Sequence, residues 1–144
     1  MKLTTKTRYS LRILVQLASR YNKAPVKGKN ISSRQNISEP YLEQIMITMK
    51  STGFVRTVRG CNGGYVLNKT PENISVLDII EVFEGKIEFA DCLENSSNCM
   101  LFSRCPTTNI WKHLSDTLKN EAKEITLQTI VDNMNESNMQ EYVI

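Results

Sequence analysis

Residues 31–67 read ISSRQNISEPYLEQIMITMKSTGFVRTVRGCNGGYVL, and this stretch decides the fold. Its first part predicts a short helix over 31–36, a turn, and a second helix that ends at Gly53. Ser38 is a good N-cap for the second helix, and Pro40 fits its first turn, where the missing N–H costs nothing. Two short helices joined by a tight turn form the helix-turn-helix pattern.

The second part of the stretch predicts a β-hairpin. Residues 54–59 alternate and are rich in β-branched side chains, as in a strand, and 65–67 form the return strand. The residues between them contain Asn62-Gly63, which is a strong turn signal. A hairpin directly after a helix-turn-helix is a wing, so the whole stretch predicts a winged helix-turn-helix.

Charge is divided unevenly along the chain. Residues 1–70 carry 13 Lys and Arg against 2 Asp and Glu, a net charge of +11, while 71–144 carry 5 against 13, a net of −8. A basic half that contains a winged helix-turn-helix predicts binding to double-stranded DNA. Charge alone fits a solvated basic face equally well, so the order of the predicted elements favours DNA.

Helices are predicted on both sides of the winged stretch. Apolar residues at spacings of three and four indicate helices over 5–21 and 75–85, and residues 22–30 break the pattern with a proline and a glycine. The expected fold class is mostly α with a small β-hairpin wing. Residues 1–85 are expected to form a winged helix-turn-helix DNA-binding domain.

The C-terminal part predicts a dimerisation helix. From 109 to 124 the apolar residues of an amphipathic helix recur at spacings of three and four: Trp111, Leu114, Leu118, Ala122 and Ile125. Such a stripe is usually core, but this helix lies outside the winged unit. We therefore expect 109–134 to hold the helix that joins a homodimer and a short terminal helix, and 135–144 to be a flexible tail.

Residues 86–108, the cysteine segment, contain three of the four cysteines: Cys92, Cys99 and Cys105. Its centre reads DCLENSSNCMLFSRCP, which is polar and turn-prone and therefore indicates a surface loop. Three thiols on one short loop can converge on a point, because such a loop closes at little entropic cost. Clustered thiolates select iron–sulfur clusters, zinc or copper(I).

The sequence argues against several other classes of protein. No apolar run is long enough to span a membrane, and Arg8 and Arg12 interrupt the apolar N-terminus, so we expect a cytoplasmic protein with no membrane partner. No nucleophile is paired with a base, and Gly63-Gly64 lies in a hairpin instead of opening a helix. We therefore expect no enzyme and no small-molecule substrate.

These residues resemble the IscR-type iron–sulfur cluster regulators and their NsrR-type and CymR-type relatives. The resemblance is carried by residues 1–18, 31–67 and 74–85, and by the three segment cysteines followed by Pro106 and Trp111. It implies a dimeric winged-helix transcription regulator with crossed C-terminal helices. Its targets would be genes of iron–sulfur cluster assembly or of related redox and cysteine metabolism.

The resemblance also implies that the three segment cysteines hold an iron–sulfur cluster, 2Fe–2S in preference to 4Fe–4S. The first cysteine gap is six residues here, where the family usually has five. Thr108 stands at the position of the histidine that completes the site in IscR-type proteins, and Arg8 stands at the aspartate of nitric-oxide sensors. The fourth ligand is open among Thr108, Asp91, His113 (better explained as a helix-surface residue), a partner-subunit carboxylate and an external thiol.

The expected DNA contacts lie at the start of the second helix and on the wing. Side chains there reach base edges in the major groove, and arginines on a glycine-tipped hairpin suit the minor groove. The candidates are Ser38, Tyr41, Glu43, Gln44, Arg56 and Arg59. Glu43 fits a solvated helix charge equally well. A dimer of such units would bind a palindromic operator, because its reading helices are related by twofold symmetry.

Two further questions about the thiols stay open. Without a cluster, the chain would be a winged-helix repressor whose signal is carried by a partner protein, zinc or direct thiol oxidation. Cys61, at the expected wing tip, is either an incidental exposed thiol or a redox thiol whose oxidation weakens DNA binding.

Overall fold

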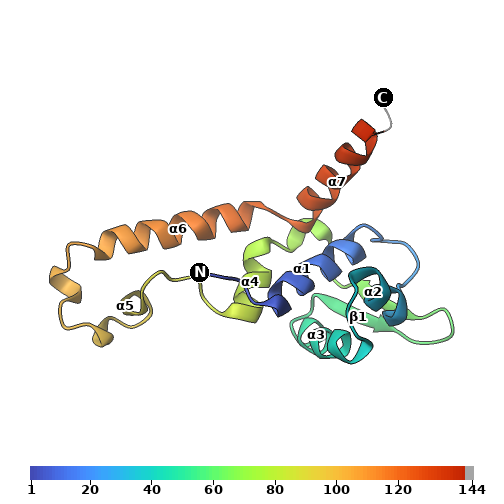
Figure 1. Cartoon of the computed structure of the whole chain (residues 1–144), viewed down its shortest axis with the longest axis horizontal. Helices are drawn as coiled ribbons and strands as arrows, with labels where there is room; N and C mark the ends of the chain where they lie inside the picture. Colours follow the sequence, from blue (N-terminus) through green and yellow to red (C-terminus); the bar gives the residue numbers. More distant parts are fainter. Residues whose placement is uncertain (142–144) are drawn as a thin grey trace.

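The computed structural model describes residues 1–141 and shows a mostly helical chain with one two-stranded hairpin. A winged unit gathers the first four helices and the hairpin, the cysteine segment runs out from it, and a long helix brings the chain back (Figure 1). The helices are α1 (Thr5–Ala18), α2 (Gly28–Gln35), α3 (Glu39–Ser51), α4 (Val76–Glu84), α5 (Asp91–Glu94), α6 (Thr108–Glu124) and α7 (Leu127–Glu141), and the strands are β1 (Val55–Val58) and β2 (Gly64–Leu67). Within the described residues, no helix is both long and apolar enough to cross a membrane.

Helix α1 lies at the centre of the winged unit. Thr4 caps it by accepting a hydrogen bond from the Thr7 amide, and its buried face carries Ile13, Leu14 and Leu17. Helices α2, α4 and α7 and strand β2 all pack against α1. The same core cluster contains Ile31, Leu42, Ile45, Met46, Met49, Phe54, Val55, Leu67, Ile74, Ile79, Leu127 and Val131. The position of α1 therefore fixes both the helix-turn-helix and the terminal helix.

The predicted helix-turn-helix is formed by α2 and α3. Helix α2 begins at Gly28, so the predicted break over 22–30 is wrong for its last three residues. Gly28 serves close packing instead of a turn, since an added Cβ would lie 3.3 Å from the Tyr65 ring. Asn36 ends α2 in the left-handed conformation, with φ at 54°. Ser38 then caps α3, as predicted, by accepting a 3.3 Å hydrogen bond from the Tyr41 amide.

The wing is the antiparallel pair β1–β2, and its tip projects beyond the helices (Figure 1). An isolated bridge fixes its base to the residues before α2: Val26 and Tyr65 exchange backbone hydrogen bonds of 3.0 and 2.8 Å. A Cβ on Gly64 would lie 2.4 Å from the Val26 carbonyl oxygen, so this close approach requires glycine. The hairpin is thereby held in a set position relative to the helix-turn-helix.

Helix α4 has the capping box predicted at Ser75 and Asp78. The Asp78 amide donates to the Ser75 hydroxyl, and the Ser75 amide donates to the Asp78 carboxylate. At the other end of α4, the Glu84 carboxylate accepts hydrogen bonds from Thr7 and Thr4 at the start of α1. The Thr7 hydroxyl, and then Thr4, lower the pKa of Glu84 because they stabilise its charged form. Helix α4 is thus joined to α1 at its C-terminal end.

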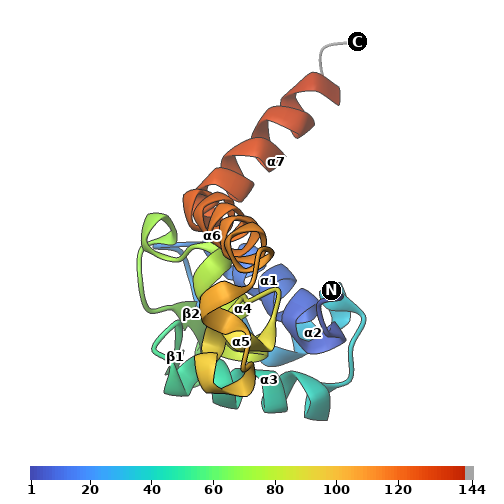
Figure 2. The ribbon, with the colours of Figure 1, turned by 90° about the vertical axis from the view of Figure 1, so that its left-hand side faces the viewer.

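Helix α7 packs on the winged unit and then projects away from it (Figure 2). Its first turns place Leu127 and Val131 in the core. It continues to Glu141, whereas the expected short helix ended at 134 and was followed by a tail. The extension has a simple cause, since residues 135–141 contain no glycine or proline that would end a helix. The Ser137 hydroxyl also donates to the carbonyl oxygen one turn earlier.

The apolar stripe predicted on α6 is only partly covered in the single chain. Ala122 is buried and Leu118 is half-buried, because this end of α6 lies against α4. Three further apolar side chains of the stripe are exposed in this chain: Trp111 at 37%, Leu114 at 41% and Ile125 at 41%. Ile110 beside them is also exposed. The half of α6 nearer the cysteine segment therefore presents an uncovered apolar face.

If α7 is part of the winged core, Leu127→Ala should lower the free energy of unfolding by about 2–5 kcal/mol, because it leaves a cavity at a fully buried position. Urea unfolding followed by circular dichroism measures this change. Leu101→Ala is the matched control, since Leu101 is 59% exposed. Equal stabilities of the two variants would show that α7 does not pack where the structure places it.

Candidate DNA-binding face and cysteine segment

Helix α3 presents a polar outer face at its N-terminal half. Glu43 and Gln44 are exposed, and Tyr41 is half-buried with its ring edge-on to Tyr9, 6.1 Å between centroids. Ser38 is exposed, but its hydroxyl oxygen accepts the capping hydrogen bond, which leaves the O–H free to donate outward. The predicted residues of α3 therefore lie together on one end of the helix.

The wing lies beside this face and adds positive charge to it. Arg56 and Arg59 are exposed on the hairpin, and Cys61 is exposed at its tip. Partial burial raises the pKa of Tyr65, and the negative charge of Glu43 raises it further, so Glu43 faces the β2 side of the wing. Helix α3 and the side of the hairpin that carries Tyr65 thus lie together in the candidate DNA-binding face, whereas Arg56, which pairs with Val66, lines a separate pocket with Arg20 and Lys23.

Two lysines that the sequence analysis did not single out extend this face. Lys27 and Lys29 flank the start of α2 and are both exposed. No acidic residue occurs before Glu39, so nothing on α1 or α2 offsets their charge. The local density of lysine over 23–29 was the signal that could have identified them.

The cysteine segment is more ordered than the predicted loop, because α5 and two single 3-10 turns (Ser96–Asn98 and Phe102–Arg104) divide it. Its three thiols are free and each is partly buried. In the part of the chain that the structure describes, no three His, Cys, Asp or Glu side chains come close enough to hold a metal ion. The predicted convergence of Cys92, Cys99 and Cys105 is therefore not seen in this structure.

The candidates for a fourth ligand are also spread out. Asp91 is exposed at the start of α5, and His113 is exposed on α6, which agrees with its reading as a helix-surface residue. The Thr108 hydroxyl oxygen is buried and makes no hydrogen bond with the described part of the chain, whose side chains are placed up to residue 138. Such a group is costly to bury without a partner. Of the candidates, Thr108 is thus the one with an unused polar atom beside a segment cysteine.

Cys105 is the most perturbed thiol of the segment. Its sulfur lies 3.2 Å from the Thr107 hydroxyl oxygen. Hydrogen bonding by this hydroxyl is the largest cause that lowers the pKa of Cys105 from the usual 9.0 to about 7. A thiolate is both the metal-binding and the nucleophilic form of cysteine, so Cys105 is prepared for either chemistry at neutral pH.

Comparison with known proteins decides the family. The profile of the Rrf2 family, described as an iron-dependent transcriptional regulator, matches residues 3–133. The chain belongs to the Rrf2 family. The resemblance inferred from the sequence is thereby confirmed.

Rrf2 relatives are similar over most of their length. The HTH-type transcriptional regulator CymR of Bacillus subtilis is 35% identical over 90% of this chain and 89% of its own. The regulator IscR of Escherichia coli O139:H28 is 35% identical over 92% and 82%. These proteins are named as transcriptional regulators, so this Rrf2 chain is a DNA-binding regulator of transcription and not an enzyme.

Solved Rrf2 structures confirm the winged-helix fold. CymR, the global cysteine regulator of B. subtilis, matches with a TM-score of 0.77 and 34% identity, over 92% of this chain and 98% of that one. T. potens IscR matches with a TM-score of 0.74 and 32% identity, over 95% and 90%. The mostly helical fold with a hairpin wing is therefore the one predicted.

The lowered pKa of Cys105 predicts its alkylation rate. In the metal-free protein, the rate constant for iodoacetamide at Cys105 should rise with a midpoint near pH 7, because the thiolate is the reacting form. Thr107→Val removes the hydroxyl and should move the midpoint toward the usual 9.0. Mass spectrometry of each cysteine after timed alkylation gives the profile. A midpoint near 9 in the unchanged chain would contradict the assigned hydrogen bond.

Proposed function

We propose that this Rrf2 protein is a homodimeric transcription regulator whose DNA affinity or specificity is controlled by an iron–sulfur cluster on the cysteine segment. The proposal is supported by the presence, in one chain, of a DNA-binding unit and of a cysteine segment that a long helix connects to it. A basic winged unit carries a polar reading helix, and three segment cysteines lie at the far end of α6, which returns to that unit. The targets proposed are genes of iron–sulfur cluster assembly or related redox and cysteine metabolism.

The proposed DNA contacts follow from the chemistry of the candidate face. Gln44 can pair with adenine, and Glu43 can accept from cytosine N4 while repelling phosphate, which restricts the sites tolerated. Arg56 and Arg59 on the wing would contact the minor groove. At the N-terminal end of α3, Ser38 and Tyr41 would contact base edges in the major groove. A protein that acts on DNA in this way would work in the cytoplasm.

The uncovered face of α6 supports the homodimer. Its exposed apolar side chains, among them Ile110, Trp111 and Leu114, continue as a stripe toward the buried end of the helix. Contiguous apolar surface of this kind is characteristic of interaction sites, and pairing two such helices would bury it. Two winged units related by twofold symmetry would then read a palindromic operator.

The types of ligand atom on the cysteine segment suit an iron–sulfur cluster, although the side chains that carry them are not close together in this structure. Cys92, Cys99 and Cys105 supply three soft sulfur donors on one surface segment, the pKa of Cys105 favours thiolate, and Thr108 carries an unused hydroxyl. A bound cluster would supply redox and oxygen sensitivity; the resemblance favours 2Fe–2S over 4Fe–4S. The cysteine segment would supply the thiolates. To do so it would have to bring α5 and the two 3-10 turns closer together, because the cysteines lie on or beside these elements.

A second candidate function keeps the DNA binding and omits the cluster. The separation of the three thiols favours it, because each of them is free in this structure. The signal would then come from zinc, from a partner protein or from direct oxidation of Cys105 or of the wing thiol Cys61. CymR, to which 90% of this chain is similar, is described as the global cysteine regulator of B. subtilis. For a cluster-free regulator, we therefore propose genes of thiol metabolism as the targets.

Arg59→Ala should weaken binding to a selected operator by about 1–3 kcal/mol, because it removes a guanidinium from the wing. Fluorescence anisotropy with labelled duplex measures the dissociation constant. Arg104→Ala is the control, since it removes the same charge from the cysteine segment, where Arg104 is exposed. An unchanged dissociation constant for Arg59→Ala would place the DNA contact away from the wing.

Anaerobic reconstitution with iron and sulfide should give a coloured protein with stoichiometric iron and acid-labile sulfide. The variant Cys92→Ser/Cys99→Ser/Cys105→Ser should stay colourless, while Cys61→Ser should load normally, because Cys61 lies on the wing. Visible absorption and metal analysis give the result. A colourless unchanged chain would leave the cluster-free regulator as the function.

A further inference from the structure

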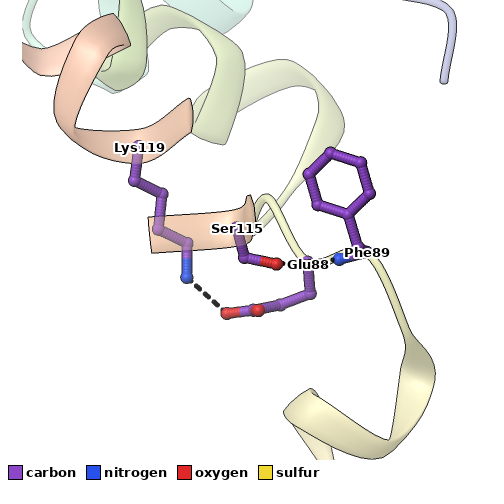
Figure 3. Close-up of polar contacts among 4 residues, drawn as sticks. All are labelled: Glu88, Phe89, Ser115 and Lys119. Carbon is purple, nitrogen blue, oxygen red and sulfur yellow. Dashed lines mark hydrogen bonds and ion pairs between the residues drawn. The ribbon is translucent and has the colours of Figure 1, made fainter. Parts of the chain in front are cut away.

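Two polar contacts attach the root of the cysteine segment to α6. Glu88 forms an ion pair with Lys119, and the Phe89 amide donates a 3.0 Å hydrogen bond to the Ser115 hydroxyl (Figure 3). Ser115 is fully buried, and the side chains of Glu88 and Lys119 are only 16% and 25% exposed. We call these two contacts the α6 clamp.

The α6 clamp is distinctive within this chain. Charged residues make up 23% of the sequence, yet Glu88–Lys119 is the only ion pair among the described side chains of residues 1–138. Because both partners are largely shielded from water, their attraction is screened less than that of a surface pair. The Phe89 amide belongs to an irregular stretch with no helical partner, so the fully buried Ser115 hydroxyl gives it a hydrogen-bond acceptor.

The α6 clamp adds to two other sets of contacts that hold α6, both nearer its C-terminal end. One is the packing of α6 against α4. The other is a pair of backbone hydrogen bonds, in which the Val76 amide donates to the Ile125 carbonyl at 2.8 Å and the Leu127 amide donates to the Ile74 carbonyl at 3.0 Å. The packing and the backbone bonds hold the C-terminal half of α6, and the clamp adds contacts at Ser115 and Lys119, nearer the cysteine segment, which restrict the direction of the helix further. The part of α6 beyond the clamp, residues 108–114, is about 10 Å long, so a rotation of the helix displaces its free end.

We propose that the α6 clamp sets the angle between α6 and the winged unit, and that Glu88, Ser115 and Lys119 are thereby positioning residues for DNA binding. This rests on the proposed function, in which α6 joins two subunits. The angle of α6 then fixes the separation of the two α3 helices, and operator half-sites lie about one helical turn, ~34 Å, apart. Cys92 follows Phe89 by three residues, so any gathering of the segment cysteines acts directly on the clamp.

The distance between the two wings tests the proposal without DNA or metal. In the full chain with the three segment cysteines replaced by serine, Cys61 is the only thiol and takes a spin label at each wing tip. Pulsed electron paramagnetic resonance should give one narrow distance distribution. Ser115→Ala and Lys119→Met should shift or broaden it, and Lys119→Arg should preserve it. Thr117→Ala and Lys123→Met, which alter exposed residues of the same helix, are the controls.

The same variants should differ in their tolerance of operator spacing. The unchanged chain should lose about tenfold in affinity when half-site spacing is altered, a penalty comparable to a mismatched base pair, while the two clamp variants should lose less than about threefold. Affinity for an isolated half-site should stay the same in all of them, because α3 and the wing are untouched.

The possible failures are distinguishable. A narrow, unshifted distribution and unchanged spacing preference in Ser115→Ala and Lys119→Met would overturn the role of the clamp while leaving the proposed function intact. A lack of any dipolar coupling in the reference protein would refute the homodimer, and the clamp proposal would fall with it. Equal effects of the clamp variants and their controls would likewise reject a specific role for these three residues.

Discussion

The structure depends on the burial of one face of α1. Ile13 and Leu14 are completely buried, and the helices on either side of them could not bury their own apolar faces without α1. Each fully buried aliphatic side chain contributes about 1.5–3 kcal/mol. The helix-turn-helix and the first turns of α7 share this one core, so the DNA-binding elements and the C-terminal elements are parts of the same cooperative unit. In the proposed function, this shared core would connect an event near α6 to α3.

The cysteine segment and the wing lie at opposite ends of the molecule, and packed helices connect them (Figure 1). The segment begins one residue after Gly85, where α4 ends, and α4 is joined to α1 through Glu84 and to α6 by packing. Helix α6 in turn reaches α7 through a linker held to the start of α4 by backbone hydrogen bonds. The cysteine segment thus lies between two helices, α4 and α6. A helix would transmit a displacement of the segment better than a loop would.

The sequence predicted most of the winged unit because local signals there are strong and agree with one another. Ser38, Pro40 and the capping box at Ser75 mark helix starts, and Asn62-Gly63 marks the wing turn. The start of α2 was misplaced because Gly28 packs closely against Tyr65 at the start of the helix, a contact that no local pattern reveals. The length of α7 was missed because residues 135–141 lack an apolar period. The contacts of Ser115 and Lys119 join residues far apart in the chain, so spacing rules could not find them.

The central claim is that the segment cysteines control how tightly the winged unit holds DNA. The most direct measurement is the affinity of the full chain for a selected operator, before and after anaerobic loading with iron and sulfide, at one fixed salt concentration. The account predicts that the two dissociation constants differ by about fivefold or more, a typical coupling between two sites, and that the chain with all three segment cysteines replaced by serine shows no difference. Equal dissociation constants in the loaded and metal-free protein would contradict it.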